Sequence, residues 1–379
     1  MKLTKEMLDY TASSMEEEQQ LIRELCGIPA PSHHEEKRAE YCKAWFERNG
    51  FENVFIDEAL NVIAPYHVTD DNEVVVFMAH TDTVFPDTEP MPFSEDEEKM
   101  YSPGVCDDTA NLSSMLMAAR YFVQNQLQPK YGIVFVANSC EEGLGNLKGS
   151  RAVVARYGKR MKALISFDGT TLNRIVTSAV GSHRYRVTVR TEGGHSYSAF
   201  GNRNAIRYLA SMIDAIYAIK VPEKEGIKTT YNVGTVSGGT SVNTICQEAT
   251  MLCEYRSNDR ECLDIMRQRF EAIFAAFGTM ADVEVELVGE RPCAGDLDPT
   301  EYGALVALAE DTIRETVGRE PIHGPSSTDC NIPLSVGIPS VCMSAAVGGK
   351  CHTRQEFTVK SELLSGCRLA MSMIGNYFA

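Results

Sequence analysis

The sequence predicts an α/β fold: a mixed, mostly parallel sheet with helices on both faces, interrupted by a smaller inserted α+β domain. Short apolar runs at 73–79, 131–138 and 162–167 alternate with helical patterns, as buried parallel strands do. From about residue 180 the strands instead alternate polar and apolar residues, which is typical of strands with one exposed face. The length of 379 residues is more than one core usually requires, which indicates two domains.

The first part of the chain predicts two amphipathic helices between its strands. One is expected at 34–49, where apolar residues recur on one side and Gly50 ends the pattern. The other is expected at 109–126, where apolar residues recur at helical spacing. The acidic run at 94–99 is expected to be a solvated loop.

The middle of the chain has the β-α-β-β-α-β order of the split ferredoxin-like unit. Asn258 or Asp259 is a suitable N-cap for its second helix. The expected strands are 183–191, 230–237, 246–257 and 282–288, and the expected helices are 203–220 and 259–278.

After Pro292 the α/β pattern returns, with a helix at 301–317 and an apolar stretch at 340–345. We therefore expect a catalytic domain built from residues 1–179 and 291–379, into which a ferredoxin-like domain at 180–290 is inserted.

The composition argues against several classes of partner. Lys and Arg number 36 and Asp and Glu 52, which gives a formal charge of −16. A surface of this charge repels phosphate backbones and anionic lipid, so neither nucleic acid nor a membrane is expected as a partner. The chain has 12 scattered cysteines without a CxxC pair, and no apolar stretch near the roughly 20 residues of a spanning helix. These features favour a cytoplasmic protein with reduced thiols.

Imidazole and carboxylate side chains lie next to the predicted strands. Ligands gather at the carboxyl ends of strands in open α/β sheets, and such donors without a cysteine quartet suit zinc, cobalt or manganese. The candidates are His80 and Asp82 after the first strand, Glu141 and Glu142 after the second, Asp168 after the third, Asp107 and Asp108 before the helix at 109, and His352 after the last apolar stretch.

The adjacent pair Glu141 and Glu142 is the most informative of these candidates. Neighbouring side chains in extended backbone point in opposite directions. One carboxylate can therefore bind a metal while the other reaches a metal-activated water, as a hydrolase requires. Each candidate alone has a structural explanation, such as a helix cap for Asp107 or a turn at Asp168. Their joint placement at strand ends is what predicts a metal site.

Five short segments, in this order, resemble those of the zinc-dependent exopeptidase and deacylase family. That family includes peptidase T, glutamate carboxypeptidase, acetylornithine deacetylase and succinyl-diaminopimelate desuccinylase. The resemblance spans nearly the whole chain, and it implies a zinc-exopeptidase-like fold with an inserted lid or dimerisation domain. The segments are AHTDT at 79–83, GVCDD at 104–108, EEG at 141–143, FDG at 167–169 and CHT at 351–353.

The resemblance implies two divalent metal ions, zinc foremost, with cobalt or manganese as alternatives. Asp107 would bridge the two ions. His80 and Asp168 would complete one site, and Glu142 and His352 would complete the other.

The resemblance also assigns roles around the metals. Asp82 would orient the ligating His80. Glu141 would be the general base that takes a proton from water and passes it to the leaving amine. His195, in the inserted domain, would stabilise the oxyanion and is expected to reach the site of a neighbouring subunit in a homodimer.

Three further residues are expected to hold the substrate. Asn243 and Arg256 resemble family residues of the inserted domain, and Arg256 could fork onto a substrate carboxylate or form a salt bridge on its strand. Asp329 resembles a loop residue that lines the cleft.

The chain also departs from the family pattern. Thr109 and Asn111 stand where many members have lysine and glycine, which weakens any transfer of substrate preference. Cys106, Cys140 and Cys351 each precede a candidate site residue. They are expected to pack as small apolar residues, and the alternative is that their thiols make activity sensitive to oxidants.

The function expected from these features is hydrolysis of a terminal peptide bond in short peptides by metal-activated water. An N-acyl-amino-acid deacylase or desuccinylase with the same site is the nearest alternative, with an N-acyl amino acid as substrate. A non-catalytic binding module and a cysteine hydrolase are alternatives of other classes. The retention of Glu141 argues against the first, and the lack of a thiol paired with histidine at a helix start argues against the second.

Overall fold

The computed structural model describes residues 1–378, which divide into two compact units. The larger unit is Met1–Ala179 together with the chain from Gly295 onward, and the smaller unit is Val180–Ala294. Within the described residues, no helix combines the length and the apolar composition needed to cross a membrane.

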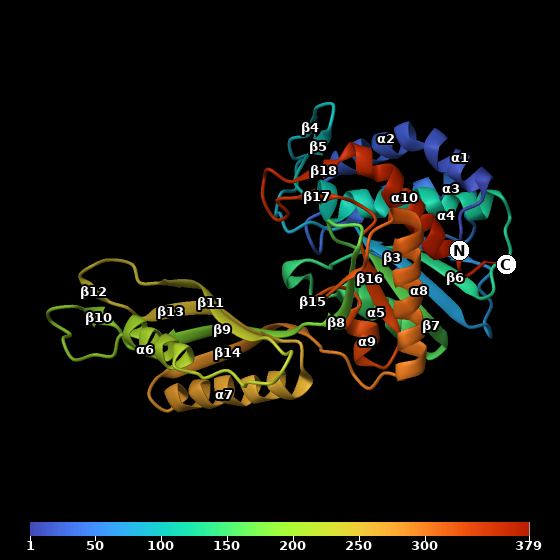
Figure 1. Cartoon of the computed structure of the whole chain (residues 1–379). Helices are drawn as coiled ribbons and strands as arrows, with labels where there is room; N and C mark the ends of the chain where they lie inside the picture. The colour runs from blue at the N-terminus through green and yellow to red at the C-terminus, as the bar shows by residue number, and fades with distance from the viewer. Residues whose placement is uncertain (379) are drawn as a thin grey trace. The chain divides into compact units, whose positions relative to one another are not determined.

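The larger unit is built on an eight-stranded mixed sheet (Figure 1). Its strands are β1 Phe55–Ile56, β2 Val62–Tyr66, β3 Val74–His80, β6 Gly132–Asn138, β7 Met161–Phe167, β8 Arg174–Ala179, β15 Ile322–Ser326 and β16 Ser340–Met343. Their order across the sheet is β1-β2-β6-β3-β7-β16-β8-β15. The central neighbours β6, β3, β7 and β16 are parallel, whereas β1 and β2 on one side, and β8 against β16, are antiparallel. This is the mixed, mostly parallel sheet that the sequence predicts.

Helices cover this sheet and bury its central strands. They are α1 Lys5–Ser13, α2 Met15–Cys26, α3 Glu36–Arg48, α4 Asn111–Gln124, α5 Lys148–Tyr157, α8 Pro299–Val317, α9 Asn331–Ser335 and α10 Lys360–Gly375. Every residue of β3 and β6 is buried, as expected for parallel strands with both faces covered. Phe77, Phe135 and Phe167 come from three adjacent strands and form a row of stacked rings in the core.

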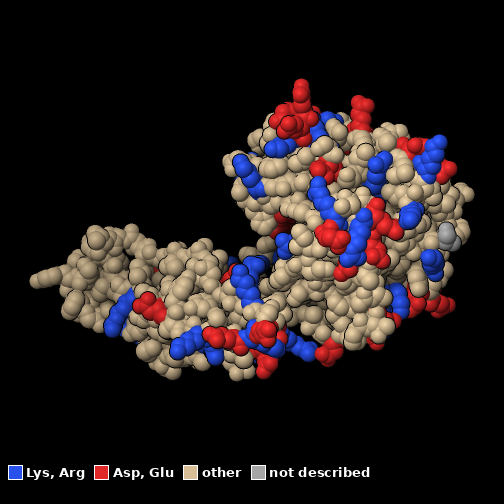
Figure 2. Space-filling model, viewed as in Figure 1, with Lys and Arg blue, Asp and Glu red and all other residues tan. Residues whose placement is uncertain are grey.

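A second small sheet supports the loop between Gly349 and Phe357. It consists of β4 Ser94–Glu95, β5 Lys99–Tyr101, β17 Gly348–Gly349 and β18 Phe357–Val359, in the order β17-β18-β5-β4. The acidic run at 94–99 is therefore a hairpin rather than a plain loop. Asp96 closes its turn by accepting hydrogen bonds from the backbone N–H groups of Glu98 and Lys99. Figure 2 shows the acidic side chains of this hairpin projecting from the larger unit.

The smaller unit has the predicted ferredoxin-like order. Its elements are β9 Gly181–Arg190, β10 Gly194–His195, α6 Ala205–Tyr217, β11 Thr229–Gly238, β12 Thr244–Ile245, β13 Glu248–Ser257, α7 Arg260–Gly278 and β14 Asp282–Arg291. The long strands form an antiparallel sheet in the order β11-β13-β9-β14. Asp259, one of the two expected caps, accepts a hydrogen bond from Cys262 N at 2.9 Å.

The two faces of the smaller sheet differ in character. Side chains such as Met251, Tyr255 and Phe270 form a core between the sheet and its helices. Arginines of β9 form ion pairs with glutamates on the neighbouring strands, such as Arg186 with Glu286. The unit therefore has a hydrophobic core of its own and a ladder of opposite charges on its strands.

Candidate metal centre

Three parallel strands of the larger sheet place candidate ligands at one edge. His80 is the last residue of β3 and is paired with Asn138, the last residue of β6. Glu141 and Glu142 follow shortly after Asn138, and Asp168 directly follows β7. Because parallel strands end at the same edge, these segments converge there.

The first group of ligand atoms consists of His80, Asp107 and Asp168. One donor atom from each lies within 4.8 Å of the donor atoms of the others. His80 Nε2 is 3.1 Å from Asp107 Oδ1. The Asp107–Asp108 peptide bond is cis, and the Asp108 carboxylate accepts a hydrogen bond from His80 N at 2.8 Å.

The second group consists of Asp107, Glu142 and His352, whose donor atoms also lie within 4.8 Å of one another. His352 Nε2 is 3.2 Å from Asp107 Oδ2 and 3.2 Å from Glu142 Oε1. Asp107 thus belongs to both groups and presents a different oxygen to a histidine of each. Glu141 lies beside them, with a carboxylate oxygen within 4.8 Å of donor atoms of His80 and Glu142.

The cluster has more negative than positive charge, which bound cations would balance. Burial, reinforced by the negative charge of Asp107, raises the pKa of Asp168 to about 7. Burial also raises the pKa of Asp108 well above its usual range. Hydrogen bonds to Asp107 and Glu142 raise the pKa of His352 to about 11. Carboxylates therefore gather here in excess of the positive charge that the two histidines can supply.

This donor set fits divalent metal ions. Histidine nitrogens with carboxylate oxygens are the ligands that zinc, cobalt and manganese take in proteins. A carboxylate that offers separate oxygens to two ligand groups has the form of a bridge between two ions. We therefore assign His80, Asp107 and Asp168 to one candidate site and Asp107, Glu142 and His352 to the other.

Asp82 connects the histidine to the glutamate pair. One of its oxygens is 3.4 Å from His80 Nδ1. Its carboxylate also accepts hydrogen bonds from the backbone N–H groups of Glu141 and Glu142, both at 2.9 Å, and from Ser32 Oγ at 2.6 Å. One buried side chain therefore orients a candidate ligand and fixes the backbone of the candidate base.

Glu356 is a supporting residue that nothing in the sequence singles out. Its buried carboxylate accepts hydrogen bonds from the N–H groups of Gly104, Cys106 and Asp107, at 3.0, 2.9 and 2.9 Å. Glu356 lies at the end of the loop that carries His352. It therefore ties the segment of one candidate ligand to the segment of another.

Asn111 explains one departure from the family pattern. Its Nδ2 donates to Cys106 O at 3.1 Å and to Gly169 O at 2.9 Å, and its Oδ1 accepts from Ala345 N at 2.6 Å. These three backbone groups belong to segments far apart in the sequence. The amide thus holds the Asp107 and Asp168 segments together. A π-helical segment, Val105–Ala110, leads directly into α4, so the helix expected from residue 109 is present.

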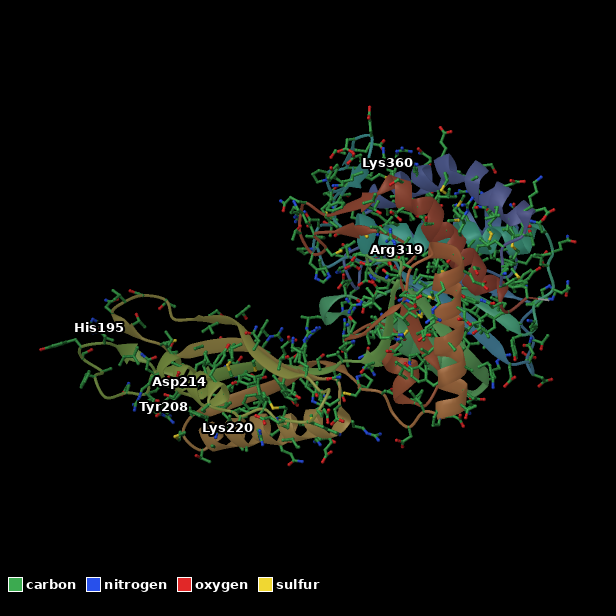
Figure 3. All side chains as sticks on the ribbon, viewed as in Figure 1. His195, Tyr208, Asp214, Lys220, Arg319 and Lys360 are labelled. Atoms are coloured by element: carbon green, nitrogen blue, oxygen red, sulfur yellow. The ribbon has the colours of Figure 1, made fainter. Side chains whose placement is uncertain are left out.

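The smaller unit brings His195 and Asn243 next to each other. His195 pairs with Thr244 across β10 and β12, and Ser196 N donates to Asn243 O at 2.9 Å. His195 is exposed, and Figure 3 shows it at the end of the smaller unit, beyond the helix that carries Tyr208. The two residues form one exposed polar group on the smaller unit.

The other two substrate candidates are engaged within the protein. The Arg256 guanidinium donates to both carboxylate oxygens of Glu254, at 2.8 and 3.1 Å, which is the salt bridge considered as its alternative role. Asp329 is 1% exposed, and its Oδ2 accepts a hydrogen bond from Asn138 Nδ2 at 2.6 Å. Asp329 therefore contacts Asn138, the last residue of β6, and its role as a residue that lines the cleft stays a prediction.

Two of the three cysteines beside the centre have the character of packing residues. Cys106 and Cys140 are fully buried, and burial, with the charges of Glu35 and Asp82, raises the pKa of Cys140 to about 12. The thiolate is the reactive form, so a thiol with a raised pKa is a poor nucleophile. Cys140 Sγ lies 3.5 Å from His33 Nδ1, but the raised pKa of this buried thiol gives no support to a cysteine hydrolase.

Comparison with known proteins identifies relatives across the whole chain. Residues 76–376 match the sequence profile described as Peptidase family M20/M25/M40. The uncharacterized protein YqjE of Bacillus subtilis is 26% identical over 381 residues, covering 93% of this chain and 95% of YqjE. A succinyl-diaminopimelate desuccinylase of Pseudomonas fluorescens is 26% identical over 273 residues, covering 67% and 69%. The crystal structure of aminopeptidase PepT from Bacillus cereus is similar with a TM-score of 0.71 and 25% identity, covering 95% of this chain and 98% of PepT.

Proposed function

The chain belongs to the peptidase family M20/M25/M40, and from that membership we propose that it is a dinuclear metal-dependent exopeptidase that cleaves a terminal peptide bond of short peptides. Peptidases and desuccinylases of this family are hydrolases of peptide or amide bonds, and they bind divalent metal ions. The chain is accordingly a metal-dependent hydrolase. The metals we propose are zinc ions, with cobalt or manganese as alternatives.

The observation that carries this proposal is the shared position of Asp107 in two ligand groups. Divalent ions held there would lower the pKa of water and polarise the carbonyl group of the substrate. A centre with two ions accounts for why one aspartate faces two histidines with different oxygens.

Glu141 is the residue that we propose as general base. Its side chain is buried beside His80 and Glu142, and its backbone N–H is held by Asp82. From this position its carboxylate would accept a proton from the attacking water. It would then donate that proton to the nitrogen of the leaving amine.

An N-acyl-amino-acid deacylase is the second candidate function. It is supported by the similarity to the succinyl-diaminopimelate desuccinylase. Deacylation needs the same water, base and leaving nitrogen, so the metal centre serves both reactions. We rank the exopeptidase first because the similarity to PepT extends over 95% of the chain.

The smaller unit is proposed to complete the enzyme. We infer a homodimer through this unit, in which His195 stabilises the oxyanion at the centre of the neighbouring subunit and Asn243 and Arg256 hold the substrate. The exposed position of His195 next to the segment of Asn243 supports this role. The free thiols of all 12 cysteines support a location in the reducing cytoplasm.

The test is metal content together with hydrolysis of dipeptides, tripeptides and N-acyl amino acids. We expect a chelator to abolish hydrolysis and added zinc, cobalt or manganese to restore it. Glu141→Gln should keep the metal ions and lower kcat by about 10²–10⁴-fold, because only the proton acceptor is removed.

The matched variant Glu142→Gln should instead weaken metal binding. Metal analysis by atomic emission separates the two outcomes. Full activity in Glu141→Gln would exclude this mechanism. Loss of metal in Glu141→Gln, with retention in Glu142→Gln, would mean that the two carboxylates have the opposite roles.

A further inference from the structure

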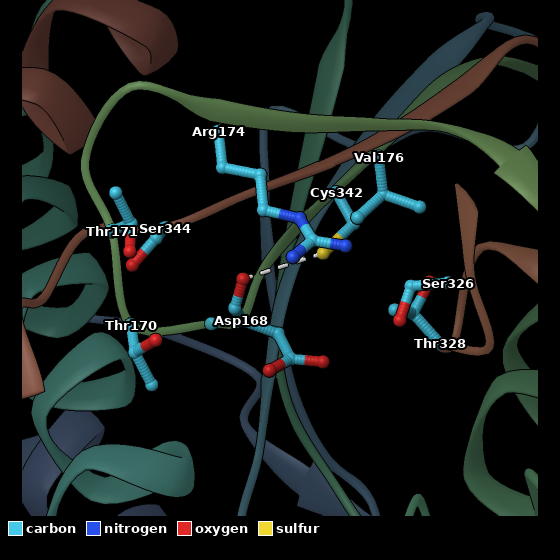
Figure 4. Close-up of a pocket in the computed structure, with 10 residues that line it drawn as sticks. Asp168, Thr170, Thr171, Arg174, Val176, Ser326, Thr328, Cys342 and Ser344 are labelled. Carbon is cyan, nitrogen blue, oxygen red and sulfur yellow. Dashed lines mark hydrogen bonds between the residues drawn. The ribbon is translucent and has the colours of Figure 1, made fainter. Parts of the chain in front are cut away.

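A pocket of about 150 Å³ opens directly beside the candidate ligand Asp168. Its walls come from the segment after β7, the start of β8 and the ends of β15 and β16. Figure 4 shows the guanidinium of Arg174 directed toward the middle of this pocket, with Thr170, Thr171 and Ser344 on one side and Ser326 on the other. The pocket lies wholly within the larger unit.

Arg174 carries a positive charge that no carboxylate of residues 1–378 neutralises by an ion pair. The only hydrogen bond that its guanidinium forms within the described residues runs from Nη2 to Pro325 O at 3.3 Å. A guanidinium has five N–H donors, so most of them are directed to solvent or to a ligand. In a chain of net charge −16, many arginines have an acidic partner, as Arg184, Arg186 and Arg314 do.

Three other hydroxyls of the pocket are uncommitted, whereas those of Thr328 and Ser344 form hydrogen bonds within the chain. The side chains of Thr170, Thr171 and Ser326 form no hydrogen bond with the described part of the chain. Each hydroxyl can donate one hydrogen bond. Beside the Asp168 carboxylate, the pocket therefore places one cation without an acidic partner and three free hydroxyl donors, which are groups that bind an anion.

We propose that this pocket binds a carboxylate group of the substrate that is remote from the scissile bond. Arg174 is the residue that selects substrates with such a carboxylate. The proposal rests on the proposed function, and it narrows the substrate class to acidic peptides or N-acyl amino acids with an acidic acyl group. A planar carboxylate accepts two parallel hydrogen bonds from a guanidinium, and the small volume suits a group of this size. Because the pocket adjoins Asp168, a short chain of the substrate would be enough to connect a carboxylate bound in the pocket to the reacting carbonyl at the metal centre.

The test uses substrate pairs that differ by one charged group. N-succinyl-alanine is compared with N-butyryl-alanine, Glu-Ala with Gln-Ala, and Ala-Glu with Ala-Gln, on the metal-loaded enzyme. We expect the acid of at least one pair to have a kcat/KM about tenfold or more above its neutral partner, as a charge-assisted hydrogen bond provides. The pair that responds identifies whether the carboxylate comes from an acyl group, a first side chain or a second side chain.

Arg174→Met keeps the side-chain stem and removes the charge. In this variant the kcat/KM for the acid divided by the kcat/KM for its neutral partner should fall to near one. Arg174→Lys should retain part of the preference for the acid. The matched control is Arg156→Met, which removes an exposed arginine that packs over the ring of Phe55, away from the pocket. It should keep the ratio of the unaltered enzyme.

A binding measurement separates this proposal from the proposed function. Metal-loaded Glu141→Gln should bind the preferred acid by calorimetry at least about tenfold more tightly than the same protein with Arg174→Met added. Hydrolysis of neutral amides without any preference for acids would overturn the subsite and leave the proposed function intact. If no amide is hydrolysed, the proposed function fails. If Glu141→Gln binds the acid with the same affinity with and without Arg174→Met, the subsite is overturned as well. If Arg174→Met lowers kcat/KM equally for the acid and for its neutral partner, the role of Arg174 is to hold β15 in place through Pro325, and the subsite is overturned.

Discussion

Asp82 shows how one buried side chain sets the geometry of a reactive group. Its carboxylate faces His80 Nδ1 and accepts the backbone N–H groups of both Glu141 and Glu142. The ring of a candidate ligand and the backbone of the candidate base are thus fixed by the same group. Glu356 acts in a similar way on the segment of Asp107. The centre is held mainly by carboxylates that accept backbone N–H groups, a strong class of hydrogen bond.

The buried carboxyl group of Glu18 should make the stability of the protein depend on pH. It is fully buried in α2 and accepts a hydrogen bond from Ser114 Oγ at 2.6 Å. Burial raises its pKa from 4.5 to about 7. Folding therefore takes up a proton, and the stabilising contribution is complete below pH 4.5 and is lost as the pH rises through about 7.

Glu18→Gln should remove this dependence because the amide has no charge to desolvate. At pH 8 we expect its free energy of unfolding to exceed that of the unaltered protein by up to about 3 kcal/mol, with a difference that shrinks toward pH 5. Urea unfolding across that range measures the effect. Glu16→Gln in the same helix is the control, since Glu16 is exposed. A difference that does not change with pH would contradict the assignment.

The sequence identifies the candidate ligands better than their supports. His80, Asp107 and Glu142 can be singled out because their side chains carry the chemistry and they stand beside predicted strands. Glu356 and Asn111 cannot, because they act through backbone groups of segments that are remote in the sequence. Such contacts leave no local pattern.

At the scale of elements, α10 packs at Gly366 against the segment that follows β16 more closely than any side chain would allow. A Cβ atom at Gly366 would lie 1.7 Å from the carbonyl oxygen of Ala345. That oxygen is part of the backbone, and Ala345 N is held by Asn111. Neither partner can move aside without disturbing the segment that follows β16.

Gly366→Ala should therefore lower the free energy of unfolding by about 1–3 kcal/mol, as overpacking of a core does. Gly303→Ala in α8 is the matched change, because a Cβ atom there would meet nothing within 4 Å. It should leave stability unchanged or raise it by up to about 1 kcal/mol through helix propensity. Urea midpoints of the two variants test the pair, and equal midpoints would contradict the close packing.

Elements with a continuous apolar pattern are the ones that the sequence predicts. The runs at 73–79, 131–138 and 162–167 correspond to β3, β6 and β7, because strands buried on both faces contain few polar residues. The sequence does not predict β8 or β15. The strand β15 contains Gly324 and Pro325, which weaken any strand pattern, and it is largely exposed at the margin of the sheet.

At the scale of the whole molecule, the chain divides chemistry between two units. The larger unit holds both candidate metal sites and the Arg174 pocket, and the smaller unit has its own core and carries His195 beside Asn243. Gly193 and Gly194, both at positive φ, precede the exposed His195 at the end of β10. The three ligand groups found among residues 1–378 all lie in the larger unit, so the exposed His195 of the smaller unit is the residue that we propose to act at the metal centre of another subunit.

That role predicts complementation between two inactive variants. In a mixed dimer of His195→Ala and Glu141→Gln, the His195→Ala subunit keeps its base and receives His195 from its partner, so one complete site forms. Random mixing should restore roughly one quarter of the activity, since half of the dimers are mixed and each has one complete site. The measurement is the rate of peptide hydrolysis after co-expression, with the dimer verified by ultracentrifugation.

The mirrored control places both changes in one chain and mixes it with the unaltered protein. If His195 acts on the neighbouring subunit, mixed dimers then contain no complete site, and roughly one quarter of the activity remains. If His195 acts within its own subunit, mixed dimers retain one complete site each, and roughly one half remains. Restoration in the first mixture together with one quarter in the second supports the shared site. A monomer with full activity would exclude it, because each site would then be complete in one chain.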